Sequence, residues 1–358
     1  MNAVSVRRTR RVWVGHVPIG GGSPVSVQAM TKCRTQDVDA TVRQVDLLAA
    51  VGAAIVRIAV PDHESAHAFG EIRKRVSVPL VADIHFDHTI ALKCLDAGAD
   101  KLRINPGNLG PKQNLVAVAK AAGQRRVPIR VGVNAGSLES RLLQRFGGPC
   151  AEALAESALQ SAAALLDVGF EDIVISAKSS DVMTCVDAYR LIASRCDWPL
   201  HIGITETGPG TAGVVKSVAG ISLLLAEGIG DTLRVSLSAA AEEEVRVGQL
   251  LLRSLGLGGT GVDIIACPTC GRARAPILHI ADEVQRALEK LKVSLRVAVM
   301  ACEVNGPGEA READIGLAAT RQGAVLFEKG EVVATGTLDE ITAQLIERAK
   351  AFDARARM

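Results

Sequence analysis

Three of the eight cysteines stand in a pattern that could hold a metal centre. The stretch "ACPTCGR" at 266–272 places Cys267 and Cys270 in C-x-x-C spacing, and "ACEVNGPGE" at 301–309 adds Cys302 and then Glu309 on a Gly-Pro-Gly loop. C-x-x-C lets two thiolates reach one metal from a single turn, and a third thiolate leaves a position that an oxygen of Glu309 could fill. The other cysteines lack ligand spacing and are expected to be reduced, small core or surface residues: Cys33, Cys94, Cys150, Cys185 and Cys196.

Three kinds of site compete for this pattern. A structural zinc site normally has four closed ligands with a second C-x-x-C or a close histidine, and the nearby histidine is His279 alone. A redox dithiol needs no third cysteine, and this C-x-x-C does not open the first helix of a thioredoxin-like βαβ unit. An iron–sulfur cluster with one replaceable ligand accounts for all four residues, so the spacing favours a cluster and leaves zinc open.

A second group of candidate functional residues consists of arginines and a lysine in segments that are predicted to be β-strands. Arg57, Arg103, Arg130, Lys178 and Arg234 fall within or at the ends of five such segments. The same segments offer further polar side chains: Asp83, His85, Asn105, Asn134, Ser176, Glu206 and Ser236. With Asp83 and Glu206 as the carboxylates at matching places, three of the five cations would lack a partner. Unpaired buried charge is costly and arginine forks fit phosphate oxygens, so we expect a bound polyanion such as a diphosphate.

The elements that must position these residues repeat along the chain as short β-rich runs separated by amphipathic helical segments. Eight runs are expected, at 25–30, 54–60, 79–85, 101–107, 128–134, 172–178, 199–205 and 232–238. Eight βα units predict an α/β fold of the (β/α)₈ TIM-barrel class rather than an open sheet, because no GxGxxG follows the first strand. In such a barrel, polar residues at the carboxyl ends of the strands face the active site.

Two domains are expected, a barrel over 1–255 and a small α/β domain over 256–358 that carries the patterned cysteines, with the glycine-rich "RSLGLGGTG" at 253–261 as the joint. The alternation of apolar with other residues in "RVWVGHVPI" predicts an N-terminal β-hairpin in preference to a transit peptide.

Composition narrows the class of function. The formal net charge of +2 and the 3% aromatic content argue against a nucleic-acid binder, so any anion site must be a local cluster. No apolar run reaches the roughly 18 residues of a membrane span, and the first thirty residues are not expected to be a secretory signal because they lack a continuous apolar region. A cytoplasmic protein without membrane association is therefore expected.

Six stretches together resemble the 4-hydroxy-3-methylbut-2-enyl diphosphate synthase family: "ACPTCGR", "CEVNGPGEAREADIG", "RINPGN", "GVNAGS", "HIGITETGPG" and "TLRVSLSA", within a resemblance that runs from about residue 7 to residue 335. The resemblance implies a dihydropteroate-synthase-like barrel followed by a [4Fe-4S] domain. It also implies reductive ring opening and dehydration of 2-C-methyl-D-erythritol 2,4-cyclodiphosphate, an isoprenoid precursor of the methylerythritol phosphate (MEP) pathway, with two electrons passing through the cluster.

Carried over to this chain, the resemblance makes Cys267, Cys270, Cys302 and Glu309 the cluster ligands, and Glu206 the carboxylate that manages a proton near the departing hydroxyl. It places these residues around the cyclic diphosphate: Arg57, Asp83, His85, Arg103, Asn105, Arg130, Asn134, Lys178, Arg234 and Ser236. It further implies a flavodoxin or ferredoxin as electron donor and a head-to-tail homodimer, although the joint would also permit closure within one chain. One departure is "QAMTKC" at 28–33 in place of an expected "QSMTNT", which leaves the role of Cys33 open.

Two other functions compete with this one. A non-redox barrel enzyme with a structural zinc would be colourless and tolerant of air. A non-catalytic iron–sulfur sensor would have no use for a cation-filled barrel, and Arg57, Arg103 and Arg130 argue against it.

Overall fold

The computed structural model describes residues 7–259, 261–291, 293–302, 308 and 312–356 and divides into two compact units, Met1–Leu257 and Gly258–Met358. Among these residues, no helix combines the length and the apolar character needed to cross a bilayer.

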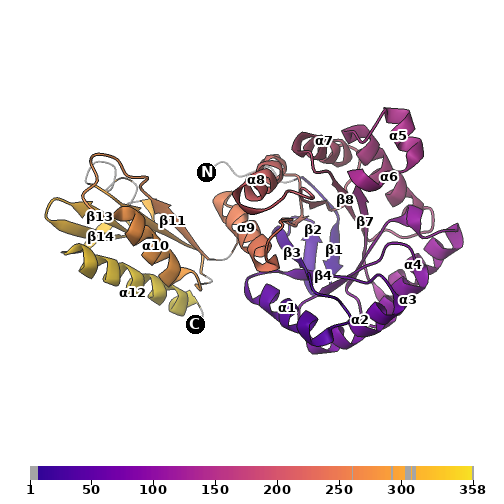
Figure 1. Ribbon diagram of the computed structural model, residues 1–358, viewed down its shortest axis with the longest axis horizontal. Helices are drawn as coiled ribbons and strands as arrows, with labels where there is room; N and C mark the ends of the chain where they lie inside the picture. Colours follow the sequence, from indigo (N-terminus) through magenta and orange to yellow (C-terminus); the bar gives the residue numbers. More distant parts are fainter. Residues whose placement is uncertain (1–6, 260, 292, 303–307, 309–311, 357–358) are drawn as a thin grey trace. The chain divides into compact units, whose positions relative to one another are not determined.

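The described part of the first unit contains a barrel of eight parallel strands (Figure 1). The strands are β3 (Ser26–Met30), β4 (Ile55–Ala59), β5 (Leu80–Asp83), β6 (Lys101–Ile104), β7 (Ile129–Asn134), β8 (Ile173–Lys178), β9 (His201–Ile202) and β10 (Thr232–Leu233). They pair in the order β8-β7-β6-β5-β4-β3-β10-β9, and a parallel bridge between Ile175 and Leu200 joins the two ends. The sheet therefore closes on itself, which confirms the expected (β/α)₈ architecture.

Helices follow the strands and surround them (Figure 1). They are α1 (Val38–Ala50), α2 (His63–Arg75), α3 (His88–Asp96), α4 (Lys112–Arg125), α5 (Ser140–Phe146), α6 (Ala151–Leu166), α7 (Val182–Ala193), α8 (Gly210–Ala226) and α9 (Ala241–Ser254), with short 3₁₀ turns at Pro106–Asn108 and Ala135–Ser137. Aspartate side chains cap several N-termini: Asp37 accepts from the Ala40 N–H and Asp62 from the Ser65 N–H. The apolar core lies between strands and helices, which leaves the inside of the barrel to other side chains.

An antiparallel hairpin of β1 (Arg11–Val14) and β2 (Val17–Gly20) precedes the barrel, as expected from the alternation in this stretch. Val14 and Ile19 are fully buried against Ile55 at the start of β4 and Val81 in β5. The hairpin therefore supplies an apolar plug for the amino-terminal end of the strands, and the inward-facing positions beyond this plug carry polar side chains.

The described residues of the second unit form a five-stranded sheet in sequence order with two helices. Its elements are β11 (Val262–Ala266), α10 (Ile277–Leu288), β12 (Leu295–Met300), β13 (Ile315–Thr320), β14 (Gly323–Glu328), β15 (Glu331–Gly336) and α12 (Leu338–Ala356). The strands β11, β12 and β13 are parallel and β13, β14 and β15 antiparallel. Both helices lie on one face of the sheet (Figure 1), where Val284 and Leu345 pack with Val297 and Leu317.

Candidate active site

One buried carboxylate organises the cations at the carboxyl ends of β4, β5 and β6. Asp83, only 4% exposed, lies 3.6 Å from Arg57 Nε, 3.3 Å from Arg103 Nη1 and 3.6 Å from His85 Nε2. Strand register explains the grouping, because Asp83 is paired with Ala59 on one side and with Arg103 on the other. Arg57 also directs Nε to the thioether of Met30 at 3.0 Å, a weak acceptor that a phosphate oxygen could replace.

The cations deeper in the barrel have no such partner. Arg130 is 1% exposed and Lys178 is 7% exposed, and neither makes an ion pair with the described residues. Arg130 Nε and Nη1 also find no hydrogen-bond acceptor there. Since buried N–H groups are nearly always satisfied, these atoms call for an acceptor beyond the described residues, such as a bound anion or an ordered water.

Charge repulsion and burial shift the pKa values of the ionisable side chains inside the barrel. Burial, followed by Arg130 and Arg234, lowers the pKa of Lys178 well below its ordinary range. Burial alone would raise the pKa of Asp83, but Arg57, His85 and Arg103 outweigh it and hold that pKa far below the usual value. The interior therefore favours negative charge strongly, which is the property an anion site needs.

The second carboxylate is not the one expected from the sequence. Glu206 is exposed, has a φ of 54° and forms no ion pair with the described residues. Arg234 instead pairs with Glu244 of α9, with Nη2 and Oε2 3.3 Å apart. The expectation of three unpaired cations out of five is corrected accordingly, because Arg57 and Arg103 share Asp83, Arg234 has Glu244, and Arg130 and Lys178 are left.

The remaining candidate residues lie at the same ends of the strands but outside these ion pairs. Asn105 is buried and its Oδ1 accepts from the Gly107 N–H at 3.2 Å, so it shapes the turn after β6. Asn134 ends β7 and is in register with Lys178. Ser236 is half-buried, and its carbonyl accepts a hydrogen bond from the Thr207 hydroxyl on the loop that carries Glu206.

Two interior residues were missed from the sequence. Lys101 and His201 are fully buried, and their side-chain nitrogens have no partner among the described residues. Burial, then Arg130 and Arg57, lowers the pKa of Lys101, and burial, then Arg130 and Lys178, lowers that of His201. The sequence did contain the information for Lys101, because it lies two residues before Arg103 on the same strand and its side chain must face the same side.

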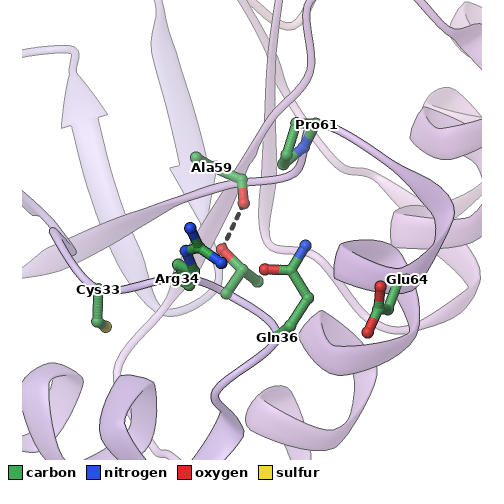
Figure 2. A pocket seen from close by; sticks show the side chains of 7 residues that line it. Cys33, Arg34, Gln36, Ala59, Pro61 and Glu64 are labelled. Carbon is green, nitrogen blue, oxygen red and sulfur yellow. Dashed lines mark hydrogen bonds between the residues drawn. The ribbon is translucent and has the colours of Figure 1, made fainter.

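An open hollow of about 460 Å³ lies among the segments that follow β3 and β4 (Figure 2). Arg34 and Gln36 line it from the loop after β3, and Glu64 lines it from α2. Cys33 is at its edge, 3.3 Å from both the Thr41 hydroxyl and Gln44 Oε1. None of the buried cations borders the hollow, so we place the anion site at the cations and not in this hollow.

The three patterned cysteines follow neighbouring parallel strands. Cys267 comes directly after β11 and Cys302 two residues after β12, and Ala266 is in register with Val299. The Cys267 N–H donates to the Val299 carbonyl at 3.1 Å, and the Arg274 N–H to the Ala301 carbonyl at 2.9 Å, so the loop with Cys270 lies along the end of β12. Glu309 lies outside the described residues.

The donor set suits an iron–sulfur group. All eight cysteines, which the structure describes throughout, are free, so the three thiols are available as ligands. Among the described residues their side chains have not converged into a metal-binding arrangement. Their common sheet end and soft sulfur donors nonetheless fit iron–sulfur ligation, in which a cluster draws thiolates together as it binds.

The fold and the cation-lined barrel define the class first: an enzyme of the (β/α)₈-barrel type acting on a small anionic substrate. Comparison with known proteins then gives the family. The GcpE TIM-barrel domain matches residues 9–249 and the GcpE protein C-terminal domain matches residues 263–351, so the chain belongs to the GcpE family.

Curated relatives support the same assignment. The 4-hydroxy-3-methylbut-2-en-1-yl diphosphate synthase (flavodoxin) of Symbiobacterium thermophilum is 52% identical over 95% of this chain and 92% of its own length. The Bacillus subtilis enzyme of the same name is 51% identical over 91% of this chain and 86% of its own length.

A truncated 3-deoxy-D-arabino-heptulosonate 7-phosphate synthase from Thermotoga maritima shares the barrel fold, with a TM-score of 0.50 and 13% identity over 70% of this chain and 95% of that one. A dihydropteroate synthase from Yersinia pestis has a TM-score of 0.48 over 69% of this chain and 98% of its own.

Family membership establishes the reaction class. The chain is an oxidoreductase of the methylerythritol phosphate route to isoprenoids, and it converts 2-C-methyl-D-erythritol 2,4-cyclodiphosphate to 4-hydroxy-3-methylbut-2-enyl diphosphate. The non-redox zinc enzyme and the non-catalytic sensor, both open from the sequence, are thereby set aside.

Proposed function

We propose that the interior cations of the barrel unit bind the cyclic diphosphate and that the cysteines of the second unit hold a [4Fe-4S] cluster that supplies the electrons. One observation carries the first half: Arg130 is fully buried with two unsatisfied N–H groups between strands that also present Arg103 and Lys178. Guanidinium forks bind phosphate oxygens in pairs, and a diphosphate offers enough oxygens for several forks together.

The proposed binding set extends around Arg130. Its other members are Arg57, Asp83, His85, Arg103, Asn105, Asn134, Lys178, Arg234 and Ser236. Asp83 would orient Arg57 and Arg103, and the remaining cations would neutralise the phosphates. The same charges would stabilise the negative charge that develops on phosphate as its bond to C2 of the substrate breaks.

The proposed cluster ligands are Cys267, Cys270 and Cys302, with Glu309 as the fourth. A cluster bound there would supply two electrons and one exchangeable coordination position. Because β11 and β12 end side by side, the polypeptide offers the thiols from one edge of the sheet.

Glu206 is the proposed proton donor to the departing C3 hydroxyl. Atoms balance when the substrate takes up two electrons and two protons and releases water. A carboxylic acid in this role needs a raised pKa in a site that excludes water. Glu206 is exposed, so its acid role depends on the site being covered during turnover.

A flavodoxin or ferredoxin is the proposed electron donor, since the curated relatives bear the name of flavodoxin-dependent enzymes. A head-to-tail homodimer is proposed as the working assembly, because substrate and cluster would be held by different units joined by a glycine-rich segment. The cytoplasm is the proposed location, in keeping with free cysteines throughout the described chain.

The cluster is tested by purifying the protein without oxygen, assaying iron and sulfide, and recording the EPR spectrum of the reduced protein with and without the cyclic diphosphate. We expect about four irons and four sulfides per chain and a spectrum that the substrate alters. One zinc and no sulfide in protein never exposed to air would refute the cluster.

The dimer is tested by mixing two inactive variants, Arg130→Met and Cys270→Ser. Active sites built from two chains would regain turnover on mixing, because each variant keeps the half that the other lacks. Absence of any regained turnover, with dimers confirmed by light scattering, would favour closure within one chain.

A further inference from the structure

The carboxylate of Glu244 links two neighbouring loops at the carboxyl end of the barrel. Glu244 lies in the first turn of α9 and is 2% exposed. Its Oε1 is 2.9 Å from Lys32 Nζ and accepts the Leu237 N–H at 3.0 Å, and its Oε2 is 3.3 Å from Arg234 Nη2. One buried side chain thus contacts two cations and one backbone donor.

These contacts attach the segment after β10 to the loop after β3. The two strands are neighbours in the barrel, and Lys32 Nζ also donates to the Leu237 carbonyl at 3.0 Å and to the Ala239 carbonyl. On its other side the same segment is tied to the loop after β9, through the Thr207 hydroxyl and the Ser236 carbonyl. Arg234 therefore belongs to a segment that is fixed from both sides.

The electrostatics of the interior explain why Arg234 needs an anchor. Burial and then the charge of Arg57 lower the pKa of Arg234, whereas Glu244 opposes both effects. Without Glu244, a flexible arginine would relieve this repulsion by turning away from the other cations. With Glu244 at Nη2, the Nε of Arg234 has no partner among the described residues and remains available.

We propose that Glu244 is a positioning residue for substrate binding, which holds Arg234 in the barrel interior against repulsion from the other cations, and that Lys32 fixes Glu244 in turn. This inference rests on the proposed binding of the diphosphate by the interior cations. Glu244 itself does not touch the substrate in this role, so its effect must pass through Arg234.

The test combines Glu244→Gln with Arg234→Met in a double-mutant cycle, measuring KM and kcat for the cyclic diphosphate with the cluster-loaded enzyme. Glutamine keeps the volume and the acceptor for the Leu237 N–H but loses both ion pairs. We expect Glu244→Gln to raise KM about ten-fold, with a smaller fall in kcat, because Arg234 would contact the diphosphate before the reaction as well as during it, so that most of the loss falls on binding. In the Arg234→Met background, the same change should alter KM less than about two-fold.

Two further variants make the result specific. Glu243→Gln removes the same charge from the same turn at an exposed position and should leave KM unchanged. Lys32→Met changes a partly exposed residue, 35% for the side chain, and should raise KM in the parent enzyme but not in the Arg234→Met background. Lys32→Met therefore tests the positioning role even if Glu244→Gln does not fold.

The outcomes separate this inference from the proposal beneath it. If Arg234→Met leaves KM unchanged, the assignment of Arg234 to the substrate site fails. A rise in KM for Arg234→Met keeps Arg234 in the substrate site. If Glu244→Gln and Lys32→Met then raise KM as much in the Arg234→Met background as in the parent enzyme, the positioning role of Glu244 is overturned. Unchanged KM in both Glu244→Gln and Lys32→Met would overturn it as well.

Discussion

Lys101 and His201 place ionisable groups inside the barrel where neither has a counter-charge among the described residues. Both are fully buried, and both have lowered pKa values because of burial and the nearby Arg130. A neutral lysine or histidine can persist in such a place, but Arg130 stays protonated at all ordinary pH values. The positive charge inside the barrel is therefore unfavourable by itself, and a bound anion would neutralise it.

His201→Gln should flatten the pH dependence of stability below the ordinary histidine pKa of 6.5. The folded-state pKa is lowered, so between that value and 6.5 the unfolded chain binds a proton that the folded chain does not, and stability falls as pH decreases. The slope for one group is at most about 1.4 kcal/mol per pH unit.

The check on His201 is chemical denaturation between pH 5 and 8, with the exposed His16→Gln as control. Lys101 and Lys178 contribute equally to parent and variant, so the difference between the two curves reports His201. Identical slopes for parent and His201→Gln would show that His201 does not titrate in this way.

Lys101→Met should stabilise the ligand-free protein and weaken diphosphate binding. Methionine fills similar volume without a buried amine. Replacing even a paired buried charge by apolar groups of like size is often neutral or stabilising by about 1–4 kcal/mol, and Lys101 has no partner to lose among the described residues. Thermal unfolding measures the gain and titration with inorganic pyrophosphate the loss. Lys120→Met on the exposed face of α4 is the control, and a lower melting temperature for Lys101→Met than for Lys120→Met would contradict the account.

At the scale of the elements, glycines in and after the strands make room for the cationic side chains. Gly132 in β7 lies against Arg103, and a Cβ there would be 2.4 Å from Nε and 2.9 Å from Nη2 of the guanidinium. A Cβ on Gly203, directly after β9, would be 2.3 Å from the Arg234 carbonyl oxygen and 2.8 Å from the Lys178 amine. Glycine at these strand positions makes room for long cationic side chains from neighbouring strands.

Gly132→Ala should therefore displace the Arg103 guanidinium and reduce substrate affinity about ten-fold. The clash involves the end of a flexible side chain, so the fold should persist. Isothermal titration with the cyclic diphosphate measures the affinity, and circular dichroism checks the fold. Gly136→Ala, where a Cβ meets no atom within 4 Å, is the matched control. Equal affinities for the two variants would mean that Arg103 is not held at this place for binding.

At the scale of the whole molecule, each unit contains its own hydrophobic core. The described barrel core runs from Val27 to Leu252, and the second unit has separate clusters around Val297 and Met300. Independent cores predict independent folding, and the division falls near Leu257.

A fragment of residues 1–257 should therefore fold alone and bind inorganic pyrophosphate without catalysing the reaction. Binding should depend on the interior cations, so the same fragment with Arg130→Met should lose it. Calorimetry with both fragments measures this. A folded fragment with no affinity would show that the second unit contributes to anion binding, and an unfolded fragment would show that the barrel needs the second unit for stability.

Much of the architecture was readable from the sequence. Strand alternation and helical periodicity are local patterns, so the eight strands, the hairpin and the inward-facing Arg57, Arg103 and Arg130 followed from the residues themselves. The cysteine spacing was equally local, and with the neighbouring motifs it predicted the family that the comparisons show.

The tertiary structure decided how these residues are paired. Glu244 reaches Lys32, from the opposite end of the barrel sequence, because β10 and β3 are neighbours in the closed barrel, and no local pattern encodes that contact. Exposure of Glu206 and the depth of His201 likewise depend on how far each strand extends relative to the next. Periodicity tells which side of a strand a residue faces, but the depth and the charge partner of that residue depend on barrel closure and strand register, which arise only when distant segments pack together.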